Sequence, residues 1–280
     1  VADTLTDNMT LVSDPLGTDT SYLTMTNLVI PSGNTLLIGP GAVLKMDSAD
    51  TITVQNGGIF QMAGTSGNEA VITSRNDDDY GGDTLGDGVT AGGRGDWNRI
   101  QFNDGGTINI DHAILRYADY TIVGNNGGGS EPALFSITNS VFDGYGTDAL
   151  YLETNAPSAT YFMDNVTIEG GDLARHGMTL RTVTSANAIL DFNNLTFNNI
   201  GNGSGDRPFD IYSSGTSVTT GTVSNVTINA TSGQGLYIND VSSGLFDVVF
   251  SGITINDASN SAVWIIGDDD TQAVFDNSVA

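Results

Sequence analysis

The chain has 280 residues, and its 36 glycines, 6 prolines and 39% hydrophobic residues fit a turn-rich globular β protein rather than a collagen-like chain. Its 33 acidic residues against 8 basic ones give a formal net charge of −25, which excludes nucleic acid and anionic membranes as partners, because phosphate contacts require Lys and Arg. No stretch approaches the roughly 18 apolar residues of a membrane-spanning helix, and the absence of cysteine excludes disulfides.

The acidic residues are nearly all aspartate, since the only glutamates are Glu69, Glu131, Glu153 and Glu169, and Lys45 is the only lysine. Such surfaces remain soluble where salt screens the repulsion between like charges. Carboxylate oxygens also bind Ca²⁺. We therefore expect an extracellular or cell-surface protein from a marine or saline environment, with Ca²⁺ as the candidate cofactor. A first residue that is Val1 is consistent with a secreted chain whose leader has been removed.

Residues 1–27 are polar and rich in Thr and Asp, with weak strand patterns at 9–12 and 22–25. We interpret them as a lead-in segment or cap, because the end of a strand stack exposes an unpaired edge. From residue 28, short apolar strands alternate with turns of the Pro-Ser-Gly-Asn and Gly-Pro-Gly type. The same style continues through 51–61, Ala70–Ser74 and Arg99–Phe102, so residues 28–115 are predicted to form the first rungs of a repeat.

Three segments of this region carry a resemblance. They are IPSGNTLLIGPGAVLKM at 30–46, AVITS at 70–74 and GDWNRI at 95–100. Together they resemble the opening of secreted prokaryotic right-handed β-helix repeat proteins, in which an apolar strand, a Gly-Pro-Gly-type turn and a Gly-Asp-Trp step begin the helix. The resemblance covers roughly residues 28–102 and implies that fold and an extracellular setting. It implies little about function, because such domains occur in surface-layer proteins, adhesins, filaments and polysaccharide-active enzymes.

An Asp- and Gly-rich insertion interrupts the strand pattern at residues 76–96 and is longer than an ordinary connection. It contains five candidate Ca²⁺ ligands, namely Asp77, Asp78, Asp79, Asp83 and Asp87. Their spacing is not that of a helix–loop–helix calcium loop. The alternative is a solvated, flexible insertion between two rungs. A shorter acidic run at 268–270 is the weaker metal candidate.

The regular part, residues 116–280, repeats a short strand motif six times. An Asn occupies its third position in five copies, at Asn139, Asn165, Asn194, Asn225 and Asn277, and Gly252 does so in the sixth, with spacings of 26, 29, 31, 27 and 25 residues. A period that drifts but keeps its phase indicates a solenoid. Asn and Gly both tolerate a left-handed backbone, so we predict a turn at this position and hydrogen bonds between stacked Asn amides. His112 holds the same phase one repeat earlier.

A second ladder keeps step with the first, at 150–152, 178–180, 209–211, 236–238 and 263–265, each with two apolar residues around an outward one. Two or three strands per repeat without a helical period predict an all-β, right-handed parallel β-helix. We expect a single domain over 1–280 with roughly nine or ten rungs of about 25–31 residues. A β-sandwich, the alternative, gives no reason for one residue type to recur at one phase.

Two other functions remain open. Asp172, Arg175 and His176 lie in one loop and offer the carboxylate and basic groups that pectate-lyase-like proteins use, so a calcium-dependent polysaccharide lyase or glycoside hydrolase is one alternative. An ordinary polar surface loop is the favoured explanation of these residues. Tyr151, Tyr237 and Trp264, outward on the second ladder, would form a carbohydrate-binding face if exposed together.

The favoured prediction is not an enzyme. We expect an extracellular structural or adhesive module of a cell surface, sheath or filament, working by stiffness and surface contacts. The last repeat runs to residue 280 without a capping sequence. We therefore expect this open end either to continue into further chain or to pair with copies of itself or other cell-surface proteins, with polysaccharide as a possible further partner.

Overall fold

The computed structural model describes residues 3–13, 21–124, 132–171, 176–201, 203, 205–231, 233–267 and 270–276. These residues form no helix, and strands account for 60% of the chain. All the strand pairs between the named elements are parallel, and the sheets stack as a β-solenoid of about nine turns. The predicted parallel β-helix is confirmed in these respects.

The strands belong to two sheets. Sheet A contains, in spatial order, β1 (Asp3–Thr4), β4 (Leu28–Ile30), β7 (Thr51–Val54), β10 (Arg99–Phe102), β13 (Tyr120–Gly124), β15 (Asp148–Thr154), β17 (His176–Thr182), β19 (Arg207–Gly215), β21 (Leu236–Ser242) and β24 (Val263–Ile266). The spatial order follows the chain order, so each turn of the chain adds one strand beside the strand of the turn before it.

Sheet B is built in the same way and bends along its length. Its main row is β2 (Met9–Leu11), β5 (Thr35–Ile38), β8 (Ile59–Ala63), β11 (Thr107–Asp111), β14 (Leu134–Asp143), β16 (Ala159–Glu169), β18 (Asn187–Asn198), β20 (Val218–Thr231), β22 (Phe246–Ser251) and β25 (Thr271–Asp276). A further row carries β3 (Tyr22–Leu23), β6 (Val43–Met46), β9 (Ala70–Ser74), β12 (Ala113–Arg116) and β23 (Thr254–Ala258). The long strands β14, β16, β18 and β20 span both rows.

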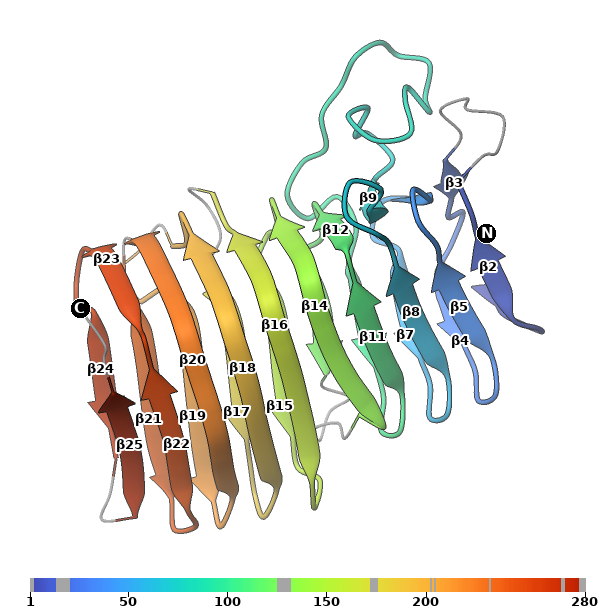
Figure 1. The fold of residues 1–280 in the computed structure, drawn as a ribbon. Helices are drawn as coiled ribbons and strands as arrows, with labels where there is room; N and C mark the ends of the chain where they lie inside the picture. The colour runs from blue at the N-terminus through green and yellow to red at the C-terminus, as the bar shows by residue number, and fades with distance from the viewer. Residues whose placement is uncertain are drawn as a thin grey trace.

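The result is an elongated stack with the N-terminus near one end and the C-terminus at the other (Figure 1). The register puts residues of one kind directly above one another. In the first ladder Ile137 pairs with Met163, Met163 with Phe192 and Phe192 with Val223, and all four are buried. In the second ladder Leu150, Met178, Phe209 and Leu236 form a similar buried column. Both ladders therefore line one continuous core.

The bend in sheet B lies where the repeated Asn predicts a turn. Asn139, Asn165, Asn194 and Asn225 have φ between 47° and 56°, and Gly252 has φ 63°. His112, the residue at the same phase one repeat earlier, has φ 47°. These left-handed residues reset which face of the strand is buried, because the apolar residues on both sides of them point into the core. Asn277 lies outside the described residues.

The predicted ladder of Asn amides forms only in part. The Asn165 amide donates to the Asn139 side-chain oxygen at 2.9 Å. The next two bonds shift by one residue, since Asn194 donates to the Asp164 carboxylate at 3.0 Å and Asn225 to the Asn193 side-chain oxygen at 2.8 Å. Where the residue just before the bend carries a carboxylate or amide oxygen, that oxygen accepts the bond from the next rung in place of the Asn at the bend.

Candidate functional site

The insertion at 76–96 joins β9 to β10 and stands out from the stack as a long loop (Figure 1). It is nevertheless tied to the rungs at several points. Arg94 donates from its guanidinium to the main-chain oxygens of Tyr145, at 2.8 Å, and of Gly170. Ser21 and Thr84 share a hydrogen bond of 3.3 Å. These contacts tie the insertion to the rungs, although much of its surface is exposed to solvent.

Arg116, at the end of β12, is the main anchor of the insertion. One terminal nitrogen of its guanidinium lies 3.1 Å from a carboxylate oxygen of Asp77 and 3.2 Å from one of Asp79, while Nε lies 3.1 Å from Asp143. The guanidinium carbon also lies 5.4 Å from the centre of the Tyr80 ring. Burial opposes its charge, but the surrounding carboxylates, Asp77 first, raise the pKa of Arg116 overall.

Lys45 is the second charged anchor. It lies in strand β6, and its side chain has no exposed surface. The ammonium donates to the main-chain oxygen of Gly82 and lies 3.9 Å from a carboxylate oxygen of Asp78. Burial lowers the pKa of this ammonium, while the carboxylates of Asp78, Asp77 and Asp83 act in the opposite direction. The only lysine of the chain thus holds the acidic loop against the stack.

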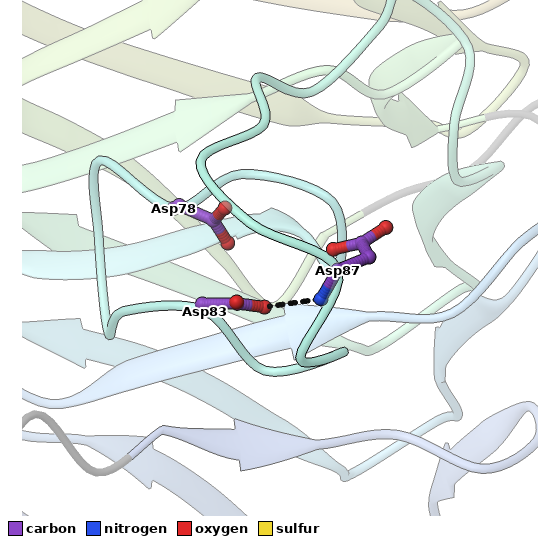
Figure 2. A group of neighbouring side chains, drawn as sticks. All are labelled: Asp78, Asp83 and Asp87. Atoms are coloured by element: carbon purple, nitrogen blue, oxygen red, sulfur yellow. Dashed lines mark hydrogen bonds between the residues drawn. The ribbon is translucent and has the colours of Figure 1, made fainter.

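Three of the five predicted calcium ligands converge in the insertion. Asp78, Asp83 and Asp87 each offer a carboxylate oxygen, and these atoms lie within 4.8 Å of one another. Figure 2 shows the three side chains around one small space, with the Asp87 main-chain N–H bonded to the Asp83 carboxylate. Asp83 and Asp87 are exposed, while Asp78 is half-buried. Carboxylates at this separation are the oxygen ligands that Ca²⁺ takes.

The loop holds Asp83 and Asp78 in fixed positions. The main-chain N–H groups of Gly86 and Gly88 donate to the two Asp83 oxygens at 2.6 and 3.0 Å, and these bonds, that from Gly88 foremost, lower the pKa of Asp83. One Asp78 oxygen accepts hydrogen bonds from the main chain and hydroxyl of Thr90 at 2.6 and 3.1 Å. Each of these carboxylates keeps lone pairs that the bonds do not use.

Asp77 and Asp79 do not join this group. Asp77 is fully buried, bonds the hydroxyl of Thr73 and pairs with Arg116. Asp79 is exposed and also faces Arg116. The two carboxylates therefore serve as partners of the anchor, and the geometry narrows the candidate calcium ligands to Asp78, Asp83 and Asp87.

The candidate catalytic loop can be followed only at His176, because Asp172 and Arg175 lie outside the described residues. His176 begins β17 and is half-buried. Burial lowers the pKa of its imidazole, against the opposing effect of the Asp210 carboxylate. Its Nδ1 atom is buried and has no hydrogen-bond partner. Nothing further in the described residues assigns it a chemical role.

The three outward aromatic residues do not form one exposed row. Tyr237 is only 7% exposed, because the Arg207 guanidinium carbon lies 3.5 Å above its ring centre. Trp264 is 42% exposed and packs beside Tyr237, with ring centres 6.4 Å apart. Tyr151 lies farther along the stack, separated from Tyr237 by the outward residues of β17 and β19.

Sequence reasoning missed a pocket of about 390 Å³ beside Tyr151, on the outer face of sheet A. Arg99, Tyr120, Val123 and Tyr151 line it. Tyr120 and Tyr151 meet edge to face with ring centres 6.5 Å apart. The available signal was the register of β10, β13 and β15, which places these residues on neighbouring strands.

None of the described residues forms a helix of the length and hydropathy that crossing a membrane requires. Comparison of the chain with models of known protein families gave no match, and neither did comparison with curated proteins or with solved structures. The fold and the local geometry are therefore the basis for any functional conclusion.

Proposed function

We propose that this protein is a structural and adhesive module of a cell surface, sheath or filament outside the cell, and that its β-solenoids associate end to end. One observation carries the proposal. In the last rung that the structure describes, Ile265 is exposed, although the residues at the same position in the two rungs before it are buried.

The column through Ile211, Ile238 and Ile265 gives the contrast most directly. Register pairs each residue with the next. Ile211 and Ile238 have no exposed surface, whereas Ile265 is 43% exposed. Ile266 and Val274 of the same rung are exposed as well, but they do not continue a buried column, because Val274 pairs with the exposed Val249 and Ile266 with the polar Asn239. A strand edge with exposed apolar side chains is a template for pairing with a further strand, either from further rungs of the same chain or from another molecule.

We propose a second copy of the chain as the occupant of this edge. The parallel strands β24 and β25 would be continued by the first strands of the next copy, β1 and β2, in the direction that every internal pair already has. Such a head-to-tail contact uses two different surfaces and does not close on itself. It therefore extends into a filament.

The charge of the chain supports the saline extracellular setting and a role for Ca²⁺. A net charge of −25 on each copy opposes association at low ionic strength, and salt screens this repulsion. At Asp78, Asp83 and Asp87, three carboxylates face one another with Lys45 as the nearest cation. A divalent cation there would reduce the repulsion within the loop, so we propose Asp78, Asp83 and Asp87 as its ligands.

Electron microscopy of the purified chain in millimolar CaCl₂, and again in EDTA, tests this proposal. We expect filaments from the unmodified chain. Ile265→Asp places a charge on the apolar edge and should leave single rods. Val241→Asp is the matched control, because Val241 is 53% exposed, lies on the side of the stack and should tolerate the same change. Dispersed rods from the unmodified chain in both solutions would contradict end-to-end association.

The EDTA arm tests the calcium part separately. Filaments that dissolve in EDTA and fail to form with Asp83→Asn would support calcium-linked assembly. Filaments that are indifferent to both would remove Ca²⁺ from the proposal and leave the end-to-end contact standing. A polysaccharide lyase or hydrolase remains the alternative function, with His176 as the described residue to replace first.

A further inference from the structure

We infer that the pocket on the outer face of sheet A binds a sugar residue that carries a carboxylate, with the ring packed against Tyr120 and Tyr151 and the carboxylate bonded to Arg99. This inference deepens the adhesive part of the proposed function by assigning a ligand class. It does not depend on end-to-end assembly.

Arg99 differs from the other described basic residues in the partners of its side chain. Among the described basic side chains, five lie within 4.0 Å of a carboxylate, namely Lys45, Arg75, Arg116, Arg181 and Arg207. Arg94 instead donates to two main-chain oxygens. The hydrogen bond found for Arg99 runs from Nε to the neighbouring Asn98 side chain at 3.0 Å. In a chain with four times as many acids as bases, a guanidinium left without a carboxylate has its terminal nitrogens available for an anion.

The pocket is a suitable size and shape for one ring. Its volume of about 390 Å³ lies near the lower end of the roughly 300–1,000 Å³ that small-molecule sites occupy. Tyr120 and Tyr151 supply two aromatic surfaces at an interplanar angle of 86°, so a ring that packs on one meets the edge of the other. The Arg99 guanidinium carbon lies over the Tyr120 ring, 5.1 Å from its centre, which places the charge at one face of that ring and leaves Tyr151 as the neighbouring packing surface.

The neighbouring acid does not repel the ligand at close range. The Tyr151 hydroxyl donates to Glu153 at 3.3 Å, and Glu153 pairs with Arg181 at 3.1 Å. The charge of Glu153 is therefore compensated, and the bond fixes the Tyr151 ring. Burial, the largest cause, raises the pKa of Tyr151 further above physiological pH, where a tyrosine hydroxyl is neutral and can donate. A second carboxylate, that of Asp148, lies in register with Tyr120 but is buried, and exposed acids farther away are screened by salt beyond about 8 Å.

NMR titration of the full chain with sodium glucuronate tests the inference, with glucose and benzoate as comparison probes. We expect glucuronate to bind at least about tenfold more tightly than either of them, because only glucuronate offers both the sugar ring and the charge-assisted hydrogen bonds. Equal binding of glucose would overturn the role assigned to the carboxylate. Equal binding of benzoate would overturn the assignment of a sugar, and no binding of any probe would overturn the site.

Two variants locate the site. Arg99→Gln should weaken glucuronate binding about tenfold or more without changing the weak binding of glucose, and Tyr120→Leu should weaken both. Arg75→Gln is the matched control, because it makes the same change of charge at an exposed ion pair with Asp47. If Arg75→Gln weakened binding as much as Arg99→Gln, net charge and not the pocket would be responsible. The titration reports on the pocket and electron microscopy reports on the ends, so either proposal can fail alone.

Discussion

The regular rungs from β14 to β22 and the rungs around the insertion are stabilised in different ways. In the regular rungs, buried apolar columns such as Met163, Phe192 and Val223 repeat at each turn. Around the insertion, two charged residues of the stack, Lys45 and Arg116, hold a loop that has no periodic core of its own. A solenoid can thus accept a long insertion where neighbouring rungs supply charged partners, and the apolar stack continues beneath it.

The largest effect should come from the core of the regular rungs. Phe192→Ala removes a fully buried ring that lies 6.3 Å from the Phe209 ring, and the cavity should lower the free energy of unfolding by about 3–5 kcal/mol. Urea denaturation measures this change. Ile189→Ala in the same strand is the control, because Ile189 is 43% exposed and its loss should change the free energy of unfolding by less than about 1 kcal/mol. Similar losses for the two variants would contradict the core assignment.

An intermediate and more local effect should come from Arg116→Gln. The substitution leaves the buried Asp77 carboxylate without its cation, which should destabilise the docked insertion by about 2–3 kcal/mol, somewhat less than for a fully buried pair. The insertion should then be cleaved by a protease while β14 to β22 stay intact, a result that mass spectrometry of the fragments can establish. Arg75→Gln breaks an exposed pair and should leave cleavage unchanged. Cleavage spread evenly over the chain would instead mean that the two regions unfold together.

The smallest effect should come from the bend that both regions share. Asn165→Ala keeps a β-carbon at φ 56° and loses the hydrogen bond to Asn139, so thermal denaturation should show a loss of about 1–2 kcal/mol. Asn165→Gly relieves the strain and loses only the hydrogen bond, so it should be milder, as Gly252 at the same position suggests. If glycine proved as harmful as alanine, the amide bond and not the backbone conformation would explain the recurrence of Asn.

The periodic part of the fold could be predicted because one physical requirement recurs at each turn. A left-handed bend selects Asn or Gly, and the same reasoning placed His112 correctly before any contact was known. The insertion could also be predicted from the sequence, because its Asp and Gly residues interrupt the strand pattern. What it contacts could not be predicted, since Arg116 and Asp77 are 39 residues apart and belong to no repeat.

The candidate sites illustrate the same limit. The acidic composition suggested five calcium ligands, but only the folded loop separates Asp78, Asp83 and Asp87 from the two carboxylates that pair with Arg116. Likewise, outward position alone suggested that Tyr237 is exposed, whereas Arg207 covers it from the preceding rung. A contact of an arginine side chain decides both outcomes, and a single sequence does not specify such contacts.

The left-handed residue at each bend also bears on how such a chain can change in size. Every repeat enters and leaves its bend with nearly the same backbone direction, as the φ values of Asn139, Asn165, Asn194 and Asn225 show. Duplicating or deleting one whole repeat would therefore lengthen or shorten the molecule by one inter-strand spacing, about 4.8 Å, with the flanking turns unchanged. Duplication of whole repeats in the gene would change the length of such a protein in steps of constant size.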